Sequence, residues 1–258
     1  MTIDQSVETG RNDGSSERAS GGTGGDYALA GPAQRILRSW WLPLAVALAA
    51  AVLLSRFDGA IDQFKWSAWM RGDVRRELEA LQQFGQGTFS VLIGLVILLL
   101  DPAKRRWLLA WALTAAILGP IVTGLKMILG RARPRLTEPY DPLLFLGPFG
   151  RYPWTNRQGS IEMLGPMEFW KRGVSDLWSM PSSHTAFAVL AAYILAHAYP
   201  RIRWVMWPLA AVVGLCRLVF DAHYLTDVIV GACVALTVCR LVVPKVVAHP
   251  LTNPRSTA

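Results

Sequence analysis

Charged residues are scarce in this chain. Asp, Glu, Lys and Arg make up 17% of its 258 residues, whereas soluble globular proteins average about a quarter. Hydrophobic residues make up 52%, and the mean hydropathy is +0.31. This composition excludes an ordinary soluble domain and is typical of a membrane protein. The 11 tryptophans agree with this class, because Trp gathers where a membrane meets water.

Cysteine is also scarce. The chain has three, Cys216, Cys233 and Cys239, and all of them lie in apolar stretches. Their number and spacing exclude a disulfide framework and a metal site built from cysteine pairs. We expect them to be buried and to pack as small hydrophobic residues.

Acidic residues are outnumbered by basic ones, and the formal net charge is +8. The basic residues stand mostly at the ends of apolar segments. They form no stripe interleaved with aromatic residues, as single-stranded nucleic acid would require, so we expect no nucleic-acid partner. The positive charge instead indicates topology signals, anionic lipid headgroups and a phosphate site.

The first residues of the chain lack any apolar periodicity. Residues 1–33 are rich in Gly, Ser, Asp and Arg, and we predict that they form a disordered cytoplasmic tail. No secretory signal peptide is expected, because the first apolar run begins only near Trp40. Residues 34–245 are predicted to form one membrane domain, and residues 246–258 a short cytoplasmic tail.

Six apolar segments follow the tail. They are residues 39–55, 83–100, 107–126, 182–199, 203–219 and 225–243. A hydrocarbon core about 30 Å thick needs roughly 20 helical residues, and about 17 are tolerated. The alternative, buried helices of a soluble protein, is weakened by six such runs in one chain. The predicted fold class is therefore all-α, a six-transmembrane-helix bundle with an extracytoplasmic cap of short helices and loops.

Basic residues in the short loops predict the orientation of this bundle. Residues 104–106, Arg201 and Arg203 fall on one side if the six helices alternate, and that side should be cytoplasmic. Both termini then lie inside, in a multi-pass protein of the inner or plasma membrane. The other side receives residues 56–82 and 134–181. The first segment predicts an amphipathic interfacial helix or, equally, a helix packed over the bundle, and the second an ordered cap.

The first of three short motifs on the non-cytoplasmic side is Lys126-x6-Arg133-Pro134. Lys126 and Arg133 are two helical turns apart, so they share one face if the helix continues to Pro134. Arg131 and Arg135 add charge. A basic cluster that only fixes topology belongs on the cytoplasmic side. A bound phosphate explains the cluster better, with Arg as a fork and Lys as a point charge.

The second motif is Pro181-Ser182-Ser183-His184. It has the form of a helix start, with Pro in the first turn and Ser as the N-cap. The free N–H groups of a helix start attract an anion. Alone, the motif is better explained by a capped helix with an incidental histidine.

The third motif is Arg217-x5-His223-x3-Asp227. His223 and Asp227 are one helical turn apart, so their side chains can meet. A carboxylate bonded to one ring nitrogen leaves the other nitrogen as a nucleophile. A structural His–Asp pair and a metal site are the alternatives. Lys126, Arg133 and Arg217 disfavour a dication there, and the motifs offer no second acidic ligand, so we expect no metal and no cofactor.

The remaining polar residues of the apolar segments receive no functional role. We expect His197 and His249 to be structural or solvated. Asp101 is interpreted as a charge at the end of a helix.

Together the three motifs resemble the three-part signature of the type 2 phosphatidic acid phosphatase superfamily. Its members include membrane lipid phosphatases and soluble acid phosphatases related to haloperoxidases. The resemblance covers the chain from the second predicted span to the sixth. It implies that His223 is the nucleophile, that His184 protonates the leaving oxygen, and that Asp227 orients the nucleophile. The phosphate-binding residues that it implies are Lys126, Arg133, Ser182, Ser183 and Arg217.

Two residues depart from the family pattern, which usually has Gly in place of Ser183 and Ser in place of Cys216. Ser183 still offers its backbone N–H to a phosphate. Cys216 removes one hydroxyl from the phosphate shell or its support, which bears on phosphate affinity and not on the class of reaction.

The resemblance implies an integral membrane lipid phosphatase that works through a phosphohistidine without a metal, with its active site facing the periplasm or exterior. Compatible substrates are undecaprenyl diphosphate, phosphatidic acid, phosphatidylglycerol phosphate and lipid A phosphates. A lipid phosphotransferase with the same site is the nearest alternative. A transporter or non-catalytic scaffold is the remote one, because transporters place charges mid-helix and these charges cluster at one surface. The sequence leaves the oligomeric state open.

Overall fold

The computed structural model describes residues 39–64, 71–136, 141, 143–156 and 158–248. The predicted tail of residues 1–33 and most of the predicted tail of residues 246–258 lie outside the described residues. The domain boundaries predicted from the sequence therefore stay predictions.

The described chain is mostly helical, as predicted. Its helices are α2 (Trp41–Leu53), α3 (Ser55–Asp62), α4 (Gly72–Leu81), α5 (Gly87–Leu100), α6 (Arg105–Leu129), α7 (Ser183–Ala198), α8 (Arg203–Val219) and α9 (Leu225–Ala248). Short 3-10 helices are η2 (Gln82–Gly85), η3 (Pro102–Lys104), η4 (Pro134–Leu136), η5 (Val174–Leu177) and η6 (Pro200–Ile202). Strands β1 (Tyr152–Thr155) and β2 (Ile161–Leu164) form one antiparallel hairpin.

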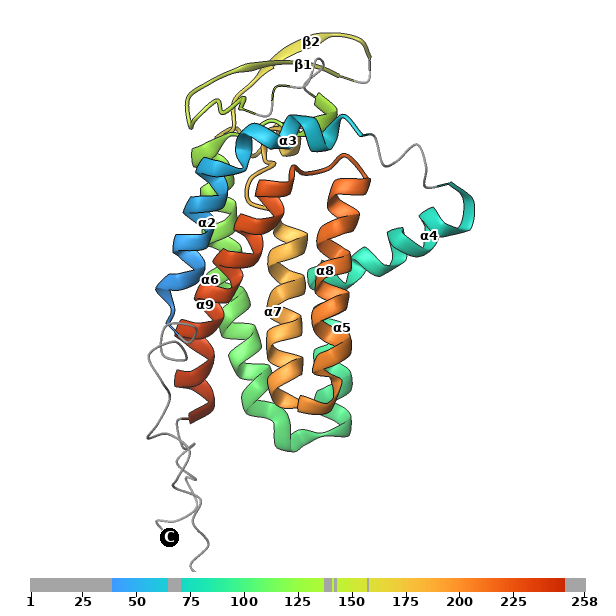
Figure 1. Cartoon of the computed structure of the whole chain (residues 1–258), viewed down its shortest axis with the longest axis vertical. Coiled ribbons are helices and arrows are strands. Elements are labelled where there is room, and N and C mark those ends of the chain that lie inside the picture. The colour runs from blue at the N-terminus through green and yellow to red at the C-terminus, as the bar shows by residue number, and fades with distance from the viewer. Residues whose placement is uncertain (1–38, 65–70, 137–140, 142, 157, 249–258) are drawn as a thin grey trace, which may run out of the picture. The chain divides into compact units, whose positions relative to one another are not determined.

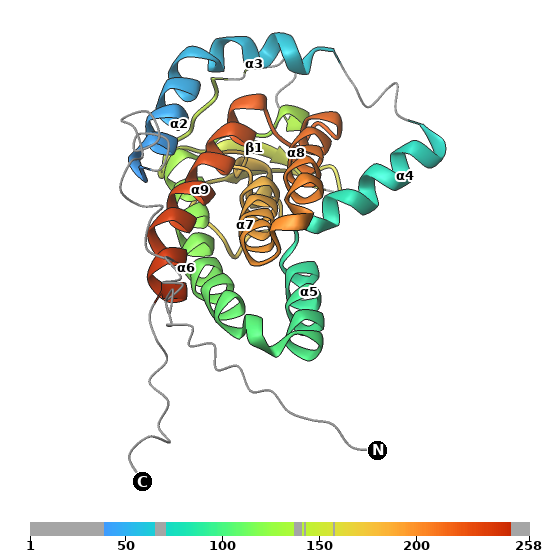
Figure 2. The same cartoon turned by 60° about the horizontal axis from the view of Figure 1, so that its bottom comes forward.

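Helix α7 is the centre of the bundle (Figures 1 and 2). It packs against α6, α8 and α9. Its sequence is rich in alanine, and its buried face includes Ala188, Ala191 and Ala192, because small side chains let neighbouring helices approach closely. Helix α5 is the opposite case, since none of its described residues is buried and Leu100 is 80% exposed. Such an apolar exposed surface suits contact with lipid.

The six predicted spans each coincide with a helix, but they differ in length. Three helical stretches are long and apolar enough to cross a membrane unaided: Pro102–Leu129, Pro200–Val219 and Leu225–Ala248. The first two predicted spans fall in bent pairs, with a bend of 65° between α2 and α3 and of 68° between the stretch Gly72–Gly85, which is α4 with η2, and α5. The count is three spans among the described residues, or up to five with each pair taken as one. Helix α7 is apolar but shorter, with 16 residues.

The segment of residues 56–82 forms two helices instead of one. Helix α3 lies across one end of the bundle (Figure 1), packs on α9 and buries Asp58 and Asp62. Helix α4 projects from the side of the bundle, contacts α8 and has no buried residue among those described. The packed alternative therefore fits α3, and the interfacial one fits α4. Residues 65–70 lie outside the described part.

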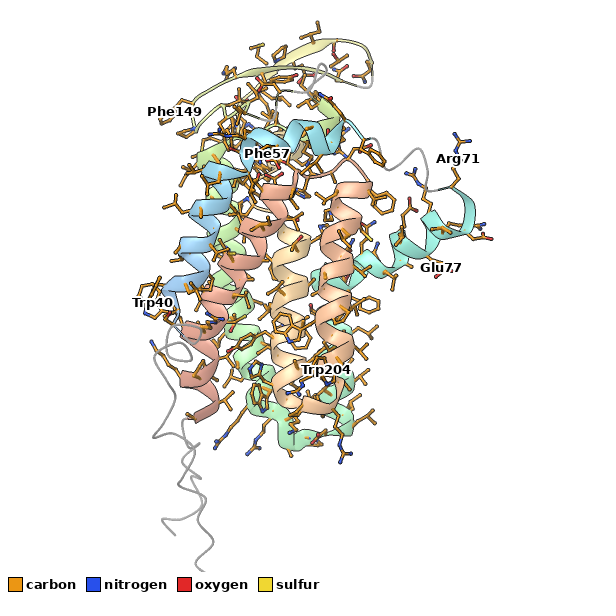
Figure 3. The ribbon with its side chains drawn as sticks, in the orientation of Figure 1. Trp40, Phe57, Arg71, Glu77, Phe149 and Trp204 are labelled. Atoms are coloured by element: carbon orange, nitrogen blue, oxygen red, sulfur yellow. The ribbon has the colours of Figure 1, made fainter. Side chains whose placement is uncertain are left out.

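Exposed aromatic side chains lie at both ends of the bundle (Figure 3). Trp204 lies toward one end, and Phe57 and Phe149 lie at the other, while Trp40 lies at the start of α2, about midway along the bundle. Trp204 is 75% exposed and Phe149 89% exposed. Aromatic side chains at both ends are the pattern expected where a helix bundle meets two membrane–water interfaces.

The predicted cap, residues 134–181, covers the same end as α3 (Figure 1). It contains η4, η5 and the β1–β2 hairpin, and it has a small core of Ala132, Leu164 and Leu177. The hairpin was not predicted. Its strands have four residues each, and Pro153 in β1 argues against a strand on sequence grounds.

Candidate active site

The first motif leaves its helix earlier than predicted. Helix α6 ends at Leu129, and Gly130 takes the left-handed conformation with φ +56°. A Cβ at Gly130 would lie 2.5 Å from Cγ of Pro166 and 2.7 Å from the carbonyl oxygen of Gly147, so only glycine fits there. The prediction that the helix runs to Pro134 is therefore wrong, and the arginines of this motif lie on the segment that follows the helix.

Lys126 and Arg133 are held by carbonyl groups of the cap. Lys126 is 5% exposed, and its Nζ donates to the carbonyl oxygen of Trp178 at 2.7 Å. Arg133 donates through Nε to the carbonyl oxygen of Ser175 at 2.9 Å. Burial and the charge of Arg135 lower the pKa of Arg133 to about 10. Both groups keep further N–H donors for an anion.

Arg217 lies in the last turn of α8 and is 8% exposed. One terminal nitrogen donates to Oε1 of Gln82 in η2 at 2.6 Å. Its buried Nε has no hydrogen-bond partner among the described residues. A buried donor of this kind is rare in native proteins, and it indicates that Arg217 is arranged for an anionic ligand.

The second motif does begin a helix, but without a side-chain cap. Ser182 is the N-cap residue of α7, and within the described part of the chain its side chain makes no capping hydrogen bond. Its Oγ instead accepts from Oγ1 of Thr185 at 3.0 Å. The first backbone N–H groups of α7, from Ser183 onwards, thus lack a side-chain acceptor and favour an anion.

His184, in the first turn of α7, is half-buried, and η2 packs against this helix. A Cβ at Gly85 of η2 would lie 2.3 Å from the carbonyl oxygen of His184. Glycine therefore lets η2 press directly on the backbone of the second motif. This contact places His184 next to the segment that also holds Arg217.

Asp227, in the first turn of α9, is fully buried. Its Oδ2 accepts a hydrogen bond from the hydroxyl of Ser179 and another from the backbone N–H of Tyr224, at 2.9 Å for the latter. Nδ1 of His223 lies 3.6 Å from the same oxygen, which is longer than a hydrogen bond. The two side chains thus face each other, as predicted, but Nδ1 of His223 has no hydrogen-bond partner among the described residues, and the histidine lies in the turn before the helix.

His223 is 2% exposed. Burial lowers its pKa well below the usual value, Asp227 opposes this shift, and Arg133 and Lys126 add to it. The imidazole is therefore neutral at pH 7, with Nδ1 toward Asp227. A neutral imidazole with one free ring nitrogen is a competent nucleophile.

Arg131 is the main residue whose role the sequence did not reveal. Its side chain is fully buried. One terminal nitrogen donates to Oδ1 of Asp227 at 2.6 Å and to Oγ1 of Thr226 at 2.7 Å, and the other donates to Oδ2 of Asp58 at 2.8 Å. From the sequence, Arg131 was one more charge in the first motif, and Asp58 had no assigned role.

The remaining sequence predictions concern residues away from these contacts. The three cysteines are free and buried, as expected, and Sγ of Cys216 lies 3.6 Å from the carbonyl oxygen of Leu78 in α4. Nδ1 of His197 lies 2.7 Å from the carbonyl oxygen of Tyr193, a structural contact. Asp101 caps the end of α5 and accepts from the hydroxyl of Tyr199. His249 lies outside the described residues.

The donor set does not suit a metal ion. Across the described residues, no three His, Cys, Asp or Glu side chains are grouped as metal ligands. Asp227 already accepts from Arg131, Ser179 and Tyr224. The cations that surround His223 favour an anion.

Two apolar cavities flank α5. One, of about 760 Å³, lies between α5, α7 and α8, and its lining includes Phe89, Leu195 and Met206. The other, of about 480 Å³, lies between α5, α6 and α7, and its lining includes Leu95 and Phe187. The cations Lys126, Arg133 and Arg217 gather at one end of this apolar helical bundle, an arrangement that suits a membrane protein with an anion site.

Comparison with known families agrees with this class. The profile of the PAP2 superfamily matches residues 105–249. This match covers more than half of the chain, and the chain belongs to that superfamily. The match includes all three motifs, whereas helices α2 to α5 precede it.

Comparison with solved structures shows the same fold. The crystal structure described as the first transmembrane PAP2 type phosphatidylglycerolphosphate phosphatase, from Bacillus subtilis, aligns with a TM-score of 0.55 and 17% sequence identity. The alignment covers 84% of this chain and 98% of the other, so it extends beyond the segment that the family profile matches. Comparison with curated protein sequences gave no match.

Proposed function

We propose that this protein is an integral membrane lipid phosphatase that hydrolyses a phosphate monoester or diphosphate through a phosphohistidine. The observation that carries the proposal is the buried imidazole of His223, which lies between Asp227 and a group of cations. Membership of the PAP2 superfamily and the apolar helices support it.

In the proposed reaction, the phosphoryl oxygens bind Lys126, Arg133, Arg217 and the backbone N–H groups at the start of α7. Nε2 of His223 forms a bond to phosphorus while the bond from phosphorus to the leaving oxygen breaks. The fixed cations stabilise the charge on the equatorial oxygens. Asp227 stabilises the imidazolium that results.

His184 supplies the proton that the leaving oxygen takes up. A bound phosphate dianion favours the protonated form of His184, because it offsets the nearby cations. In the second step a water molecule attacks phospho-His223, His184 accepts a proton from that water, and inorganic phosphate leaves. No step requires a metal, so activity should persist in EDTA; a loss of activity that a divalent ion restores would instead indicate a metal enzyme.

The apolar surfaces along the bundle support a lipid as the substrate. The apolar cavities beside α5 and the exposed apolar surface of that helix suit an acyl or prenyl chain. The relative from Bacillus subtilis is described as a phosphatidylglycerolphosphate phosphatase, which makes that lipid one candidate. Undecaprenyl diphosphate, phosphatidic acid and lipid A phosphates are the others, and an assay of phosphate release across the four separates them.

The experiment that tests the proposal compares His223→Ala with His197→Ala in detergent micelles. His197 is the matched control, since it is a histidine of α7 with a purely structural contact. We expect His223→Ala to abolish phosphate release and His197→Ala to retain most of it. Near-normal turnover by His223→Ala contradicts the proposal. Phosphorylated lipid in place of free phosphate indicates the phosphotransferase alternative.

A second variant separates the two histidines. His184→Ala should lose turnover of lipid phosphates but still form a phosphoenzyme from a substrate with a good leaving group, such as p-nitrophenyl phosphate, because that oxygen needs no proton. Trapping with an alkaline denaturing quench, which preserves the acid-labile P–N bond, and mass spectrometry should place the phosphoryl group on His223. A phosphoryl group on another residue contradicts the assignment.

The proposed orientation has both chain ends in the cytoplasm and the site on the periplasmic or outer side, in a multi-pass membrane protein. It rests on the basic short loops, such as that of residues 104–106. Labelling of a cysteine introduced at Ser15 with a membrane-impermeant reagent tests it. Protection in intact cells is expected, and labelling there reverses the orientation.

A further inference from the structure

The reaction steps proposed above assign no role to the buried group formed by Asp58, Arg131 and Thr226. Arg131 joins α3 to α9, since it binds Asp58 on one helix and Thr226 and Asp227 on the other. Thr226 closes the group, because its backbone N–H donates to Oδ1 of Asp58 at 3.1 Å and its hydroxyl donates to Oδ2. All of these side chains are essentially inaccessible to solvent.

The charges of this group decide how Asp227 can act. If Asp227 were paired with Arg131 alone, the two charges would cancel, and in a buried site the attraction between them is strong. The carboxylate would then do little for a cationic His223. Asp58 binds the second terminal nitrogen of Arg131. Two carboxylates and one guanidinium carry one net negative charge, which remains available to His223.

The geometry keeps the two tasks of Asp227 on different oxygens. Arg131 binds Oδ1. Ser179 and Tyr224 bind Oδ2, the oxygen that lies 3.6 Å from Nδ1 of His223. Arg131 thus fixes the plane of the carboxylate without blocking the oxygen that faces the nucleophile.

We propose that Asp58 and Arg131 are positioning residues for phosphoryl transfer: Arg131 orients Asp227, and Asp58 offsets the charge of Arg131 so that Asp227 stabilises the cationic form of His223. The inference rests on the proposed role of His223. Asp58 lies on α3, which crosses the end of the bundle above the site (Figures 1 and 2). It precedes residues 105–249, the segment that the family profile matches.

The test separates binding of the transition state from binding of the ground state. Orthovanadate adopts the five-coordinate geometry of the transferring phosphoryl group and bonds to the nucleophile, whereas inorganic phosphate binds only through the cations. In Asp58→Asn we expect inhibition by vanadate to weaken roughly 10- to 100-fold, the range seen when outer-shell partners are removed. The inhibition constant for phosphate should stay within about twofold, and kcat should fall with little change in KM.

The double variant Asp58→Asn/Arg131→Gln distinguishes an effect of charge from an effect of packing. It removes one negative and one positive charge, so the net charge of the group returns to that of the wild type. We expect it to bind vanadate better than Asp58→Asn does. A group that only held α3 in place predicts the reverse order, because two changes damage the packing more than one.

The control is Asp101→Asn, the same change at the opposite end of the bundle, where Asp101 bonds to Tyr199. It should leave both inhibition constants unchanged. An Asp58→Asn enzyme that loses phosphate and vanadate binding in parallel, or loses neither, overturns the inference and leaves the role of His223 standing. Activity of His223→Ala overturns the proposed function itself, so the two failures are distinguishable.

Discussion

The region beneath α3 and the region beside η2 each contain a buried arginine, and they hold it differently. Beneath α3, Arg131 binds two carboxylates and a hydroxyl. Beside η2, Arg217 binds the neutral amide of Gln82, and its Nε has no partner among the described residues. A guanidinium between carboxylates has its charge offset within the protein. One with a neutral partner keeps its charge for an anion that arrives from outside.

The largest effect is expected from Arg131→Gln. This change leaves Asp58 and Asp227 buried and unpaired, and breaking a buried ion pair in this way costs about 3–5 kcal/mol. The apparent Tm in detergent should fall by roughly 10 °C. Thermal unfolding followed by tryptophan fluorescence measures it.

The matched control is Arg151→Gln. Arg151 pairs with Glu168 at 2.7 Å, but its side chain is 53% exposed, and exposed pairs contribute about 1 kcal/mol or less. Equal Tm values for Arg131→Gln and Arg151→Gln would show that Arg131 contributes no more to stability than an exposed arginine does. Arg131 could then no longer be distinguished from Arg217 as the structural arginine.

Arg217→Gln should lower activity strongly and stability only slightly. Loss of one preorganised donor to the phosphoryl group typically lowers activity by roughly 100- to 1000-fold. The Tm should change by only a few degrees, because the single bond to Gln82 contributes on the order of 1 kcal/mol. Phosphate release and thermal unfolding are measured on the same samples. A Tm loss as large as that of Arg131→Gln contradicts the assignment of Arg217 to the ligand.

The pH dependence reports how the two regions act together on His223. Asp227 raises the pKa of His223, whereas burial, Arg133 and Lys126 lower it, and the net shift is downward. His223 should therefore stay neutral and active below pH 6.5. The acid limb of kcat/KM should lie below that value.

The lowered pKa of His223 should also make the folded protein less stable at acid pH. Below pH 6.5 the unfolded chain binds a proton at His223 that the folded protein does not, so stability falls as pH falls toward the folded pKa. Thermal unfolding between pH 7 and pH 5 should show this loss in the wild type and less of it in His223→Gln. If the acid limb of kcat/KM is instead centred at or above pH 6.5, the pKa of His223 is not lowered in the folded protein.

The sequence indicated the helices well, and it pointed to candidate site residues that the fold brings to one end of the bundle, because both leave local signals. Apolar runs mark α6, α8 and α9, and three motifs at their ends mark the site. The end of α6 was missed, because the left-handed conformation of Gly130 is enforced by Pro166 and Gly147, which are distant in the chain. A single sequence contains no local sign of such a contact.

The supporting partners of the site were missed for the same reason. Asp58 and Arg131 are 73 residues apart, and Gln82 and Arg217 are 135 apart. Each acidic or amide partner lies in the first 100 residues, before the family motifs begin. The motifs thus predict which groups react, and the pairing across the bundle determines which arginine is left for the ligand.

The smallest effect is expected from Cys216→Ser, which restores the residue that the family usually has. Sγ of Cys216 lies 3.6 Å from the carbonyl oxygen of Leu78 in α4. A serine hydroxyl at this position would therefore donate to that carbonyl oxygen and not to the phosphate. KM and the inhibition constant for phosphate should change less than about twofold.

Gln82→Leu is the comparator in the same region. It removes the one bond that orients Arg217, and loss of about 1 kcal/mol corresponds to a KM roughly fivefold higher. If Cys216→Ser lowers KM as much as Gln82→Leu raises it, the thiol lies within reach of the phosphate, and Arg217 is not the only group beside η2 that sets phosphate affinity.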